Sequence, residues 1–351
     1  MRKLATIRRI DAIRPIPEAE LIECAVVGGW TVVVKVGEYR AGDLAIYCEI
    51  DSWIPHELAP FLSKGKEPND YNGVRGERLR TIRLRGQLSQ GLLLPFTSTL
   101  ADYAKDYDDE GQPFWMGPAD FFQEGEDVSE MLGIQKWEAP IPAQLAGDVR
   151  GMFPSFIPKT DQERIQNLTA EIEDYRNREL SFEVTEKLDG SSMTVYSFED
   201  DQGVCSRNLN LKETAHNSLW MVARRDGLLD KISGRDIALQ GELVGEGIQG
   251  NPYKIKGQQF FCYDIYDIRA GKYFTPEQRR EFCHTYEINH VPVYAKLSQI
   301  TETVAEMLLG AERKSTLNSG AEQEGVVFKC NQDPAVSFKC ISNRFLIKTG
   351  G

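Results

Sequence analysis

A lysine stands at the end of a strand-like run in the second half of the chain, and a strand-breaking Asp-Gly pair follows closely. Residues 182–186 alternate apolar and polar side chains, which predicts a half-buried strand, and residues 193–198 predict a second strand. Lys187 then lies near the mouth of a hairpin-like turn, beside Gly190, which permits close approach of a ligand. The pattern predicts an amine held at the edge of a pocket, although such sequences also occur in ordinary surface turns.

Five short segments follow the lysine in order along the chain. They are residues 206–208, 239–245, 260–267, 324–329 and 337–342. With the lysine segment, they resemble in order and spacing the motifs of the covalent nucleotidyltransferases, which include ATP-dependent RNA ligases, DNA ligases and mRNA capping enzymes. The resemblance extends from about residue 153 to residue 348 and is closest to RNA ligases with an N-terminal OB-like module. It implies an α+β fold, in which an adenylyltransferase domain combines antiparallel sheets with flanking helices.

The resemblance implies that Lys187 attacks the α-phosphate of ATP and then carries AMP as lysyl-AMP. A free lysine has a pKa near 10.4, so only about one side chain in two thousand is neutral at pH 7. The charged form of the nucleophile must therefore be disfavoured. Nearby cations have that effect, and Lys339 and a bound Mg²⁺ are the candidates. A solvated turn lysine is the alternative interpretation.

Four further residues receive roles from the same resemblance. Arg207 contacts ATP or the adenylate, and Phe261 stacks on adenine. Glu242 and Glu324 handle the ribose and Mg²⁺ or Mn²⁺, either directly or through water, because Mg²⁺ keeps several of its waters. The alternatives are a surface ion pair for the arginine, core packing for the phenylalanine, and hydrogen bonds to backbone amides for the two glutamates.

Two lysines near the end of the chain are candidates for the phosphate pocket. Lys339 alternates with Phe338 and Cys340, so it points away from them, which suits a lysine that faces a phosphate. Lys329 has the same relation to Phe328 and is a second candidate for this pocket. For both lysines, a solvated strand face is the alternative.

Two more residues complete the predicted nucleotide site. Glu186 directly precedes the nucleophile and is assigned to the site with it. Arg164 lies in a segment where Thr160 or Asp161 can cap a helix beginning at residue 162, and RNA ligases of this type often carry an arginine at this place. We therefore expect Arg164 to contact a phosphate or RNA. A solvated helix arginine is the alternative.

The chain divides into three predicted parts. Residues 1–96 contain several short strands with glycine turns, which predict a small all-β, OB-like barrel that binds RNA. Residues 97–150 form an acidic connector, and residues 151–351 form the nucleotidyltransferase domain. In that domain, residues 217–230, 275–288 and 298–311 are expected to be helical.

Composition agrees with an enzyme that is neither secreted nor embedded in a membrane. The 351 residues include no apolar run near 18 residues, and the basic N-terminus lacks the apolar segment of a signal peptide. The seven cysteines form no Cys-x-x-Cys pair, which favours reduced thiols in a cytoplasmic or nucleoplasmic compartment and argues against zinc. The net charge of −12 is unusual for an RNA-binding protein, but five arginines cluster within residues 75–85.

These observations predict a monomeric, ATP-dependent RNA ligase. It would join RNA 3′-hydroxyl and 5′-phosphate ends, at nicks in a duplex among others, through lysyl-AMP and RNA-adenylate intermediates. A DNA ligase or capping enzyme is an alternative, although both carry a C-terminal OB domain and this sequence ends soon after Lys348. A non-catalytic RNA-binding OB protein is another, against which the intact set of Lys187, Glu242, Glu324 and Lys339 argues.

Overall fold

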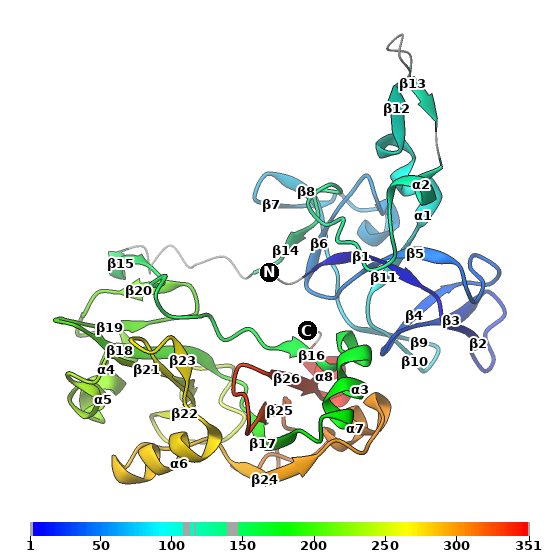
Figure 1. Ribbon diagram of the computed structural model, residues 1–351. Helices are drawn as coiled ribbons and strands as arrows, with labels where there is room; N and C mark the ends of the chain where they lie inside the picture. The colour runs from blue at the N-terminus through cyan, green and yellow to red at the C-terminus, as the bar shows by residue number, and fades with distance from the viewer. Residues whose placement is uncertain (1–2, 108–112, 116, 139–146, 350–351) are drawn as a thin grey trace. The chain divides into compact units, whose positions relative to one another are not determined.

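A computed structural model describes residues 3–107, 113–115, 117–138 and 147–349 (Figure 1). The described residues form two compact units, one from residues up to 138 together with 346–349, and the other from residues 147–345. The first is built mainly from short strands, and the second combines antiparallel sheets with helices. The α+β fold class predicted from the sequence is confirmed.

The N-terminal unit consists of small antiparallel sheets around two apolar clusters. One sheet contains β1 (Ala5–Arg9), β5 (Leu44–Cys48) and β11 (Leu92–Pro95), and a second contains β2 (Ala12–Pro15), β3 (Ile22–Val27) and β4 (Trp30–Lys35). A third contains β14 (Gln135–Lys136), β6 (Ser52–Pro55), β8 (Val74–Arg78) and β7 (Asn69–Tyr71). Two further strand pairs are β9 (Ile82–Leu84) with β10 (Gln87–Ser89) and β12 (Lys105–Tyr107) with β13 (Pro113–Trp115). The α-helices are α1 (Phe96–Leu100) and α2 (Pro118–Phe121). As the sequence predicts, β3 and β4 form a hairpin around Gly28, whose φ of 58° suits a residue without a side chain.

The predicted acidic connector lies partly outside the described residues, which omit 108–112, 116 and 139–146. Its described part packs on the N-terminal sheets, because Leu100, Phe122 and Val128 join the same buried cluster as Ile7 and Ile46. Apolar side chains, and not only acidic ones, therefore determine how this segment folds.

Two sheets form the framework of the C-terminal unit (Figure 1). The seven-stranded sheet has the order β15 (Val149–Met152), β20 (Leu209–Leu211), β19 (Asp201–Cys205), β18 (Ser191–Phe198), β21 (Ile237–Gly245), β22 (Gln258–Asp267) and β23 (Lys272–Tyr273). The five-stranded sheet has the order β16 (Glu163–Arg164), β26 (Ser337–Ile341), β25 (Gly325–Cys330), β17 (Ser181–Lys187) and β24 (Val293–Gln299). The helices are α3 (Thr169–Asn177), α4 (Ser218–Arg225), α5 (Leu228–Ile232), α6 (Pro276–Thr285) and α7 (Val304–Gly310). Helix α8 (Asn343–Thr349) begins in this unit, and its residues 346–349 belong to the first unit.

Helices cover one face of each of these sheets. Apolar residues of α4, α5 and α6 pack with those of β18, β21 and β22, and residues of α3 and α7 pack with β17, β25 and β26. Because neighbouring residues of a strand point to opposite faces, the polar residues between these apolar ones lie on the faces away from the helices. Those two faces carry most of the predicted site residues.

The structure corrects the local environment of the lysine motif. The sequence predicts a hairpin at Lys187, but β17 and β18 do not pair with each other and belong to different sheets. Residues 188–190 cross from one sheet to the other. The reason is that β17 pairs with β25 and β24, while β18 pairs with β19 and β21.

Two of the predicted helices also differ from the structure. The helix expected from residue 162 is instead the short strand β16, which pairs in parallel with β26, and a 3-10 helix follows at Ile165–Asn167. The helix expected over 298–311 begins only at Val304, after a capping box between Thr303 and Glu306, because β24 extends to Gln299. The helix over 275–288 is confirmed as α6, whereas residues 217–230 form α4 and α5 with Gly227 between them.

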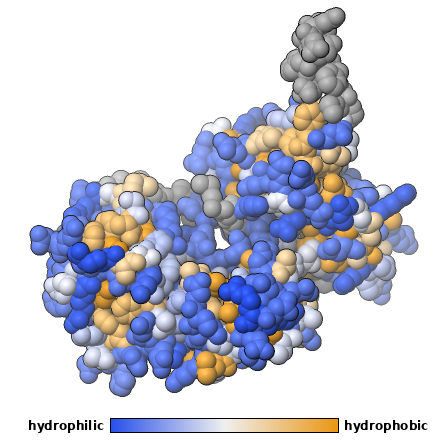
Figure 2. Space-filling model, in the orientation of Figure 1, coloured by the Kyte–Doolittle hydropathy of each residue, from blue (hydrophilic) through white to orange (hydrophobic). Residues whose placement is uncertain are grey.

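Hydrophilic residues cover most of the face of the molecule that Figure 2 presents, with apolar residues scattered among them. Among the described helices, none combines the length and the apolar character that crossing a membrane requires.

Candidate active site

Lys187 is the last residue of β17, at the junction of the two sheets of the C-terminal unit. Its backbone pairs with Gly325 of β25, where a side chain could not fit, because a Cβ atom would lie 2.2 Å from the carbonyl oxygen of Cys340. The strand ladder therefore fixes the backbone of Lys187 on one side. On the other side, the chain turns away into the second sheet.

The Lys187 amine forms an ion pair with Glu324, and Nζ lies 2.6 Å from Oε2. Burial by itself would lower the pKa of Lys187, but the carboxylates of Glu324 and Glu242 outweigh it, so the pKa is raised above 10.5. These carboxylates therefore stabilise the ammonium form of the side chain. The expected effect of Lys339 and of a bound Mg²⁺, which would disfavour this charge, stays a prediction.

Two more carboxyl groups share the electrostatic environment of Lys187. Burial raises the pKa of Glu242 to about 8, and the charges of Glu324 and Asp189 add to this while Lys187 opposes it. Burial and Glu324 raise the pKa of Asp189 to about 6. Glu242 lies on β21 directly opposite Phe261 of β22, which places the two side chains on one face of the seven-stranded sheet.

The carboxylates near Lys187 suit a phosphate-bound divalent cation. No cluster of three or more His, Cys, Asp or Glu side chains with metal-binding geometry occurs among the residues that the structure describes. Mg²⁺ is usually held by one or two carboxylates together with substrate phosphates and water. Glu242 and Glu324 fit that donor set.

Lys339 lies on the same face of the five-stranded sheet as Lys187. Lys187 of β17 pairs with Gly325 of β25. Two residues further along β25, Val327 pairs with Thr185 on one side and with Lys339 of β26 on the other. Because paired residues and residues two positions apart point to the same face, both lysines face away from α3 and α7.

Asp161 forms ion pairs with one basic side chain from each of the two sheets. Its Oδ1 lies 3.4 Å from Nζ of Lys339, and its Oδ2 lies 3.5 Å from Nη2 of Arg207. Arg207 follows β19 of the seven-stranded sheet, and its side chain is 57% exposed. A partly solvated pair of cations at the sheet junction is suited to bind phosphate groups.

Arg164 belongs to β16, opposite Lys339 of β26, and its side chain is buried. It therefore does not project from the first turn of a helix, and its predicted contact with a phosphate or RNA stays a prediction. Glu186 is also buried, but on the face opposite to Lys187, where its Oε2 accepts hydrogen bonds from Oη of Tyr294 (3.0 Å) and the backbone N–H of Thr316 (2.9 Å). Its assignment to the nucleotide site also stays a prediction.

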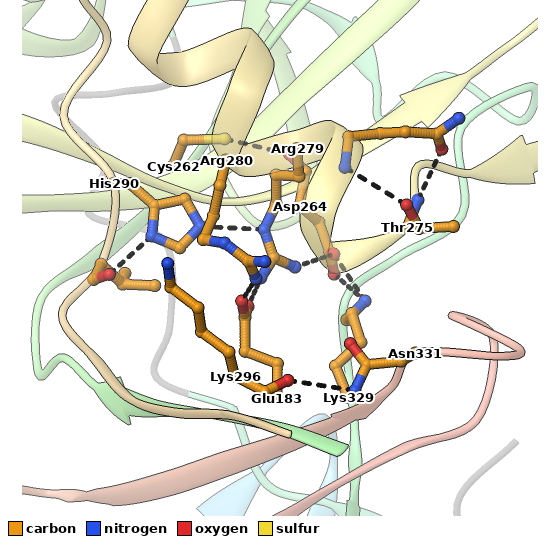
Figure 3. A network of polar contacts seen from close by, with 12 residues as sticks. Glu183, Cys262, Asp264, Thr275, Arg279, Arg280, His290, Lys296, Lys329 and Asn331 are labelled. Carbon is orange, nitrogen blue, oxygen red and sulfur yellow. Dashed lines mark hydrogen bonds and ion pairs between the residues drawn. The ribbon is translucent and has the colours of Figure 1, made fainter. Parts of the chain in front are cut away.

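Lys329 takes part in a buried ionic network that joins the two sheets (Figure 3). Its Nζ lies 2.5 Å from Oδ1 of Asp264, which also pairs with Arg279 of α6 at 3.3 Å. Arg279 and Arg280 both pair with Glu183, which lies four residues before Lys187 on β17. Burial lowers the pKa of Lys329, while Asp264 opposes this effect.

The network also includes a neutral histidine (Figure 3). Nε2 of His290 lies 2.9 Å from Nε of Arg279, which must donate, and Nδ1 lies 2.6 Å from the carbonyl oxygen of Val291. The neutral ring with its proton on Nδ1 satisfies both contacts. Burial and the neighbouring arginines lower the pKa of His290 to about 3.

Phe261 is 8% exposed and packs with Leu188, Val244, Tyr253 and Val291. It is thus part of an apolar cluster that begins one residue after Lys187. Its predicted stacking on adenine stays a prediction.

Sequence reasoning missed two residues of this site. The sequence indicates Asp161 only as a helix cap, and its contacts with two cations depend on the strand pairing of β16. Tyr253 lies in a glycine-rich loop, and its hydroxyl oxygen accepts a hydrogen bond from the backbone N–H of Asp189. The sequence near Tyr253 carries no signal of that contact, which depends on the loop conformation.

Comparisons with known proteins agree with this geometry. A family model described as RNA ligase matches residues 180–348, and one described as an OB-fold domain matches residues 4–96. The chain is 46% identical to the RNA ligase of Naegleria gruberi, and a mutant of that ligase with AMP and Mn superposes with a TM-score of 0.85, covering 98% of both chains. The same values hold for a mutant with ATP and Mn.

The structure of the Naegleria gruberi ligase with PPi also superposes with a TM-score of 0.85 and covers 99% of this chain and 98% of that one. Among curated protein sequences, no significant match was found.

Proposed function

This chain belongs to the family of ATP-dependent RNA ligases, and on that premise we propose that it seals nicks in RNA duplexes with Lys187 as the carrier of AMP. The observation that carries the proposal is the position of Lys187 between two sheets, paired with Glu324 and on the same sheet face as Lys339. Membership of this family separates the chain from DNA ligases, from capping enzymes and from a non-catalytic RNA-binding protein.

In the proposed first step, the Lys187 amine loses a proton to solvent and attacks the α-phosphorus of ATP. A P–N bond forms, the bond between the α-phosphorus and the bridging oxygen breaks, and pyrophosphate leaves with the electron pair. Lys339 and Arg207 offset the negative charge of the phosphates. Positioned cations are the main requirement of phosphoryl transfer.

In the second step, an oxygen of an RNA 5′-phosphate attacks the phosphorus of lysyl-AMP and the P–N bond breaks. In the third, the RNA 3′-hydroxyl attacks the 5′-phosphate, a phosphodiester forms, and AMP leaves. Arg164 is assigned to the nucleotide site by family resemblance and is also a candidate contact for RNA. Lys329 is assigned to it by its alternation with Phe328, and Glu186 by its position next to Lys187. Phe261 is the proposed stacking partner of adenine.

The metal proposed for these steps is Mg²⁺ or Mn²⁺, held by Glu242 and Glu324 directly or through water. When bound, it neutralises charge on the phosphates. Glu242 shares the electrostatic environment of Lys187 and Glu324, and a cation there would stabilise the charged form of its carboxyl group.

The three predicted parts of the chain have separate proposed tasks. Residues 1–96 bind RNA, residues 97–150 connect the two domains, and residues 151–351 carry out adenylylation. The support is that exposed arginines at positions 75, 80, 83 and 85 lie on or beside short strands of the N-terminal unit. Phosphate contacts by such residues make RNA binding dependent on salt.

We further propose that the enzyme acts as a monomer in the cytoplasm or nucleoplasm. All seven cysteines lie in the described part of the chain and are buried free thiols, which supports a reducing compartment.

A labelling experiment with radioactive ATP tests the nucleophile. The wild-type chain and a Lys272→Ala control, which changes an exposed lysine of β23, are expected to become labelled, and Lys187→Ala is not. A labelled Lys187→Ala protein with a native fold would refute the assignment.

Sealing of nicked duplexes with RNA or DNA at the 3′-hydroxyl and 5′-phosphate ends tests the substrate. Exclusive joining of single strands would refute nick sealing.

A further inference from the structure

The loop between β21 and β22 reaches the turn that follows Lys187. Tyr253 of this loop is only 4% exposed, and its hydroxyl oxygen lies 2.5 Å from the backbone nitrogen of Asp189, which donates the hydrogen bond. Gln249 of the same loop donates from Nε2 to the carbonyl oxygen of Gly190 at 3.4 Å. The loop therefore contacts two residues of the turn.

Backbone groups of this turn depend on such outside partners. β17 ends at Lys187 and β18 begins at Ser191, so residues 188–190 lie between the strands. A buried backbone N–H without a partner costs free energy comparable to a lost hydrogen bond. The Tyr253 hydroxyl removes that cost at Asp189.

Packing holds the rest of the turn in place. Leu188 is 3% exposed and belongs to the apolar cluster that contains Val244, Tyr253 and Phe261. A Cβ atom on Gly190 would lie 2.4 Å from the carbonyl oxygen of Leu243, so the turn fits closely on β21.

The loop that carries Tyr253 has its own supports. Asn251 hydrogen-bonds Ile255 through both its side-chain nitrogen and its side-chain oxygen, at 2.9 and 3.1 Å. Asn318, from a separate part of the chain, donates to the carbonyl oxygen of Pro252 at 2.7 Å. The Tyr253 hydroxyl is thus held by contacts outside the lysine turn.

We propose that Tyr253 is a positioning residue for lysine adenylylation. Its hydroxyl fixes the backbone N–H of Asp189, two residues after Lys187. This contact restricts the direction from which the Lys187 amine approaches the α-phosphorus. Small displacements of a nucleophile strongly reduce the rate of its attack. This inference rests on the proposed role of Lys187. It predicts an effect on formation of lysyl-AMP and not on joining of RNA that is already adenylated.

Tyr253→Phe tests the inference, because it removes the hydroxyl and keeps the ring in its apolar cluster. Tyr196→Phe is the matched control: Tyr196 is also buried in this unit, and its hydroxyl donates to Asp201 at 2.8 Å, away from the lysine turn. Three quantities are measured for each protein. They are the rate constant of lysyl-AMP formation at saturating ATP, the ATP concentration for half-maximal rate, and the rate of joining a nicked RNA duplex with a 5′-adenylate in the absence of ATP.

Tyr253→Phe is expected to slow lysyl-AMP formation about tenfold, which corresponds to about 1.4 kcal/mol in the barrier. The half-maximal ATP concentration and the joining of adenylated RNA should each stay within about twofold of wild type. Should Tyr253→Phe not fold, Gln249→Ala at an exposed loop position tests the same turn, with an expected twofold to threefold slowing of the same step.

Three results would overturn the inference: wild-type adenylylation by Tyr253→Phe, an equal loss in joining adenylated RNA, or an equal loss in Tyr196→Phe. Lys187→Ala distinguishes these results from failure of the proposed function. Persistent AMP labelling of Lys187→Ala refutes the nucleophile itself, whereas an inactive Lys187→Ala beside a fully active Tyr253→Phe refutes only the role of Tyr253.

Discussion

Replacing Lys329 by methionine separates two interpretations of that residue. The alternation of Lys329 with Phe328 makes it a candidate for the phosphate pocket, while the structure surrounds its amine with Asp264 and the ring of Tyr273, whose centroid lies 4.6 Å from Nζ. Methionine keeps much of the volume and removes the charge. If the main role of Lys329 is in the ionic network, Lys329→Met should reduce stability more than adenylylation.

The expected loss of stability follows from the burial of the pair. The side chains of Lys329 and Asp264 are 5% and 3% exposed, so solvent screens their interaction little. Breaking a buried pair by removing one partner costs about 3–5 kcal/mol, since the remaining charge is left uncompensated. Arg279 still pairs with Asp264, which favours the lower end, about 3 kcal/mol. In a unit of this size, that loss lowers Tm by about 6–12 °C.

Thermal unfolding and AMP labelling of the folded protein at low temperature measure the two effects. Lys272→Met, at an exposed position of β23, is the matched control and should change neither. A Lys329→Met protein with wild-type Tm and strongly reduced labelling would refute the structural interpretation and assign Lys329 to the phosphate pocket.

Four further predictions address the site, the metal, the N-terminal unit and the dependence on pH. Lys187→Ala should abolish covalent AMP labelling and keep the fold, as judged by circular dichroism. Glu242→Ala and Glu324→Ala should each reduce labelling at least tenfold, and excess chelator should abolish it in the wild type; full activity in chelator would remove the metal from the mechanism. A chain beginning at Gly151 should form lysyl-AMP but seal nicks poorly, and the full chain should lose RNA affinity as salt rises; equal sealing by the folded short chain would exclude a role of residues 1–96 in RNA binding. The pKa of His290 is about 3 in the folded chain and about 6.5 in the unfolded one, so the unfolded chain takes up an extra proton as pH falls. The wild type should therefore lose about 2 kcal/mol of stability between pH 7 and 5, and His290→Gln should not. Equal acid sensitivity of the two proteins in urea unfolding would contradict this.

The sequence predicted the family and the fold class, and three of the predicted site residues lie close to the sheet junction. Lys187, Glu324 and Lys339 lie on strands or at their ends, where a period of two determines which face a side chain takes. Short motifs on separate strands therefore identified neighbours in space. Their catalytic roles stay predictions.

Predictions failed where pairing between distant segments overrode local signals. Residues 163–164 have a helix-like context, yet they pair with β26, more than 170 residues later in the chain. The turn after Lys187 resembles a hairpin, but each flanking strand finds its partners elsewhere. Lys329 and Lys339 have the same alternating pattern, but Lys329 pairs with buried Asp264 of another sheet, whereas Lys339 pairs with the more exposed Asp161.

The electrostatics around Lys187, the proposed nucleophile, illustrate the same limit. Residue types alone do not determine whether the pKa of Lys187 is raised or lowered, because the motifs around it contain both lysines and glutamates. The structure places Glu324 in direct contact and adds the field of Glu242, so the pKa of the resting amine is raised. A protonated amine cannot attack phosphorus, so the proposed reaction requires Lys187 to lose a proton. A divalent cation held by Glu242 and Glu324 would weaken their hold on that proton and would therefore favour the neutral amine.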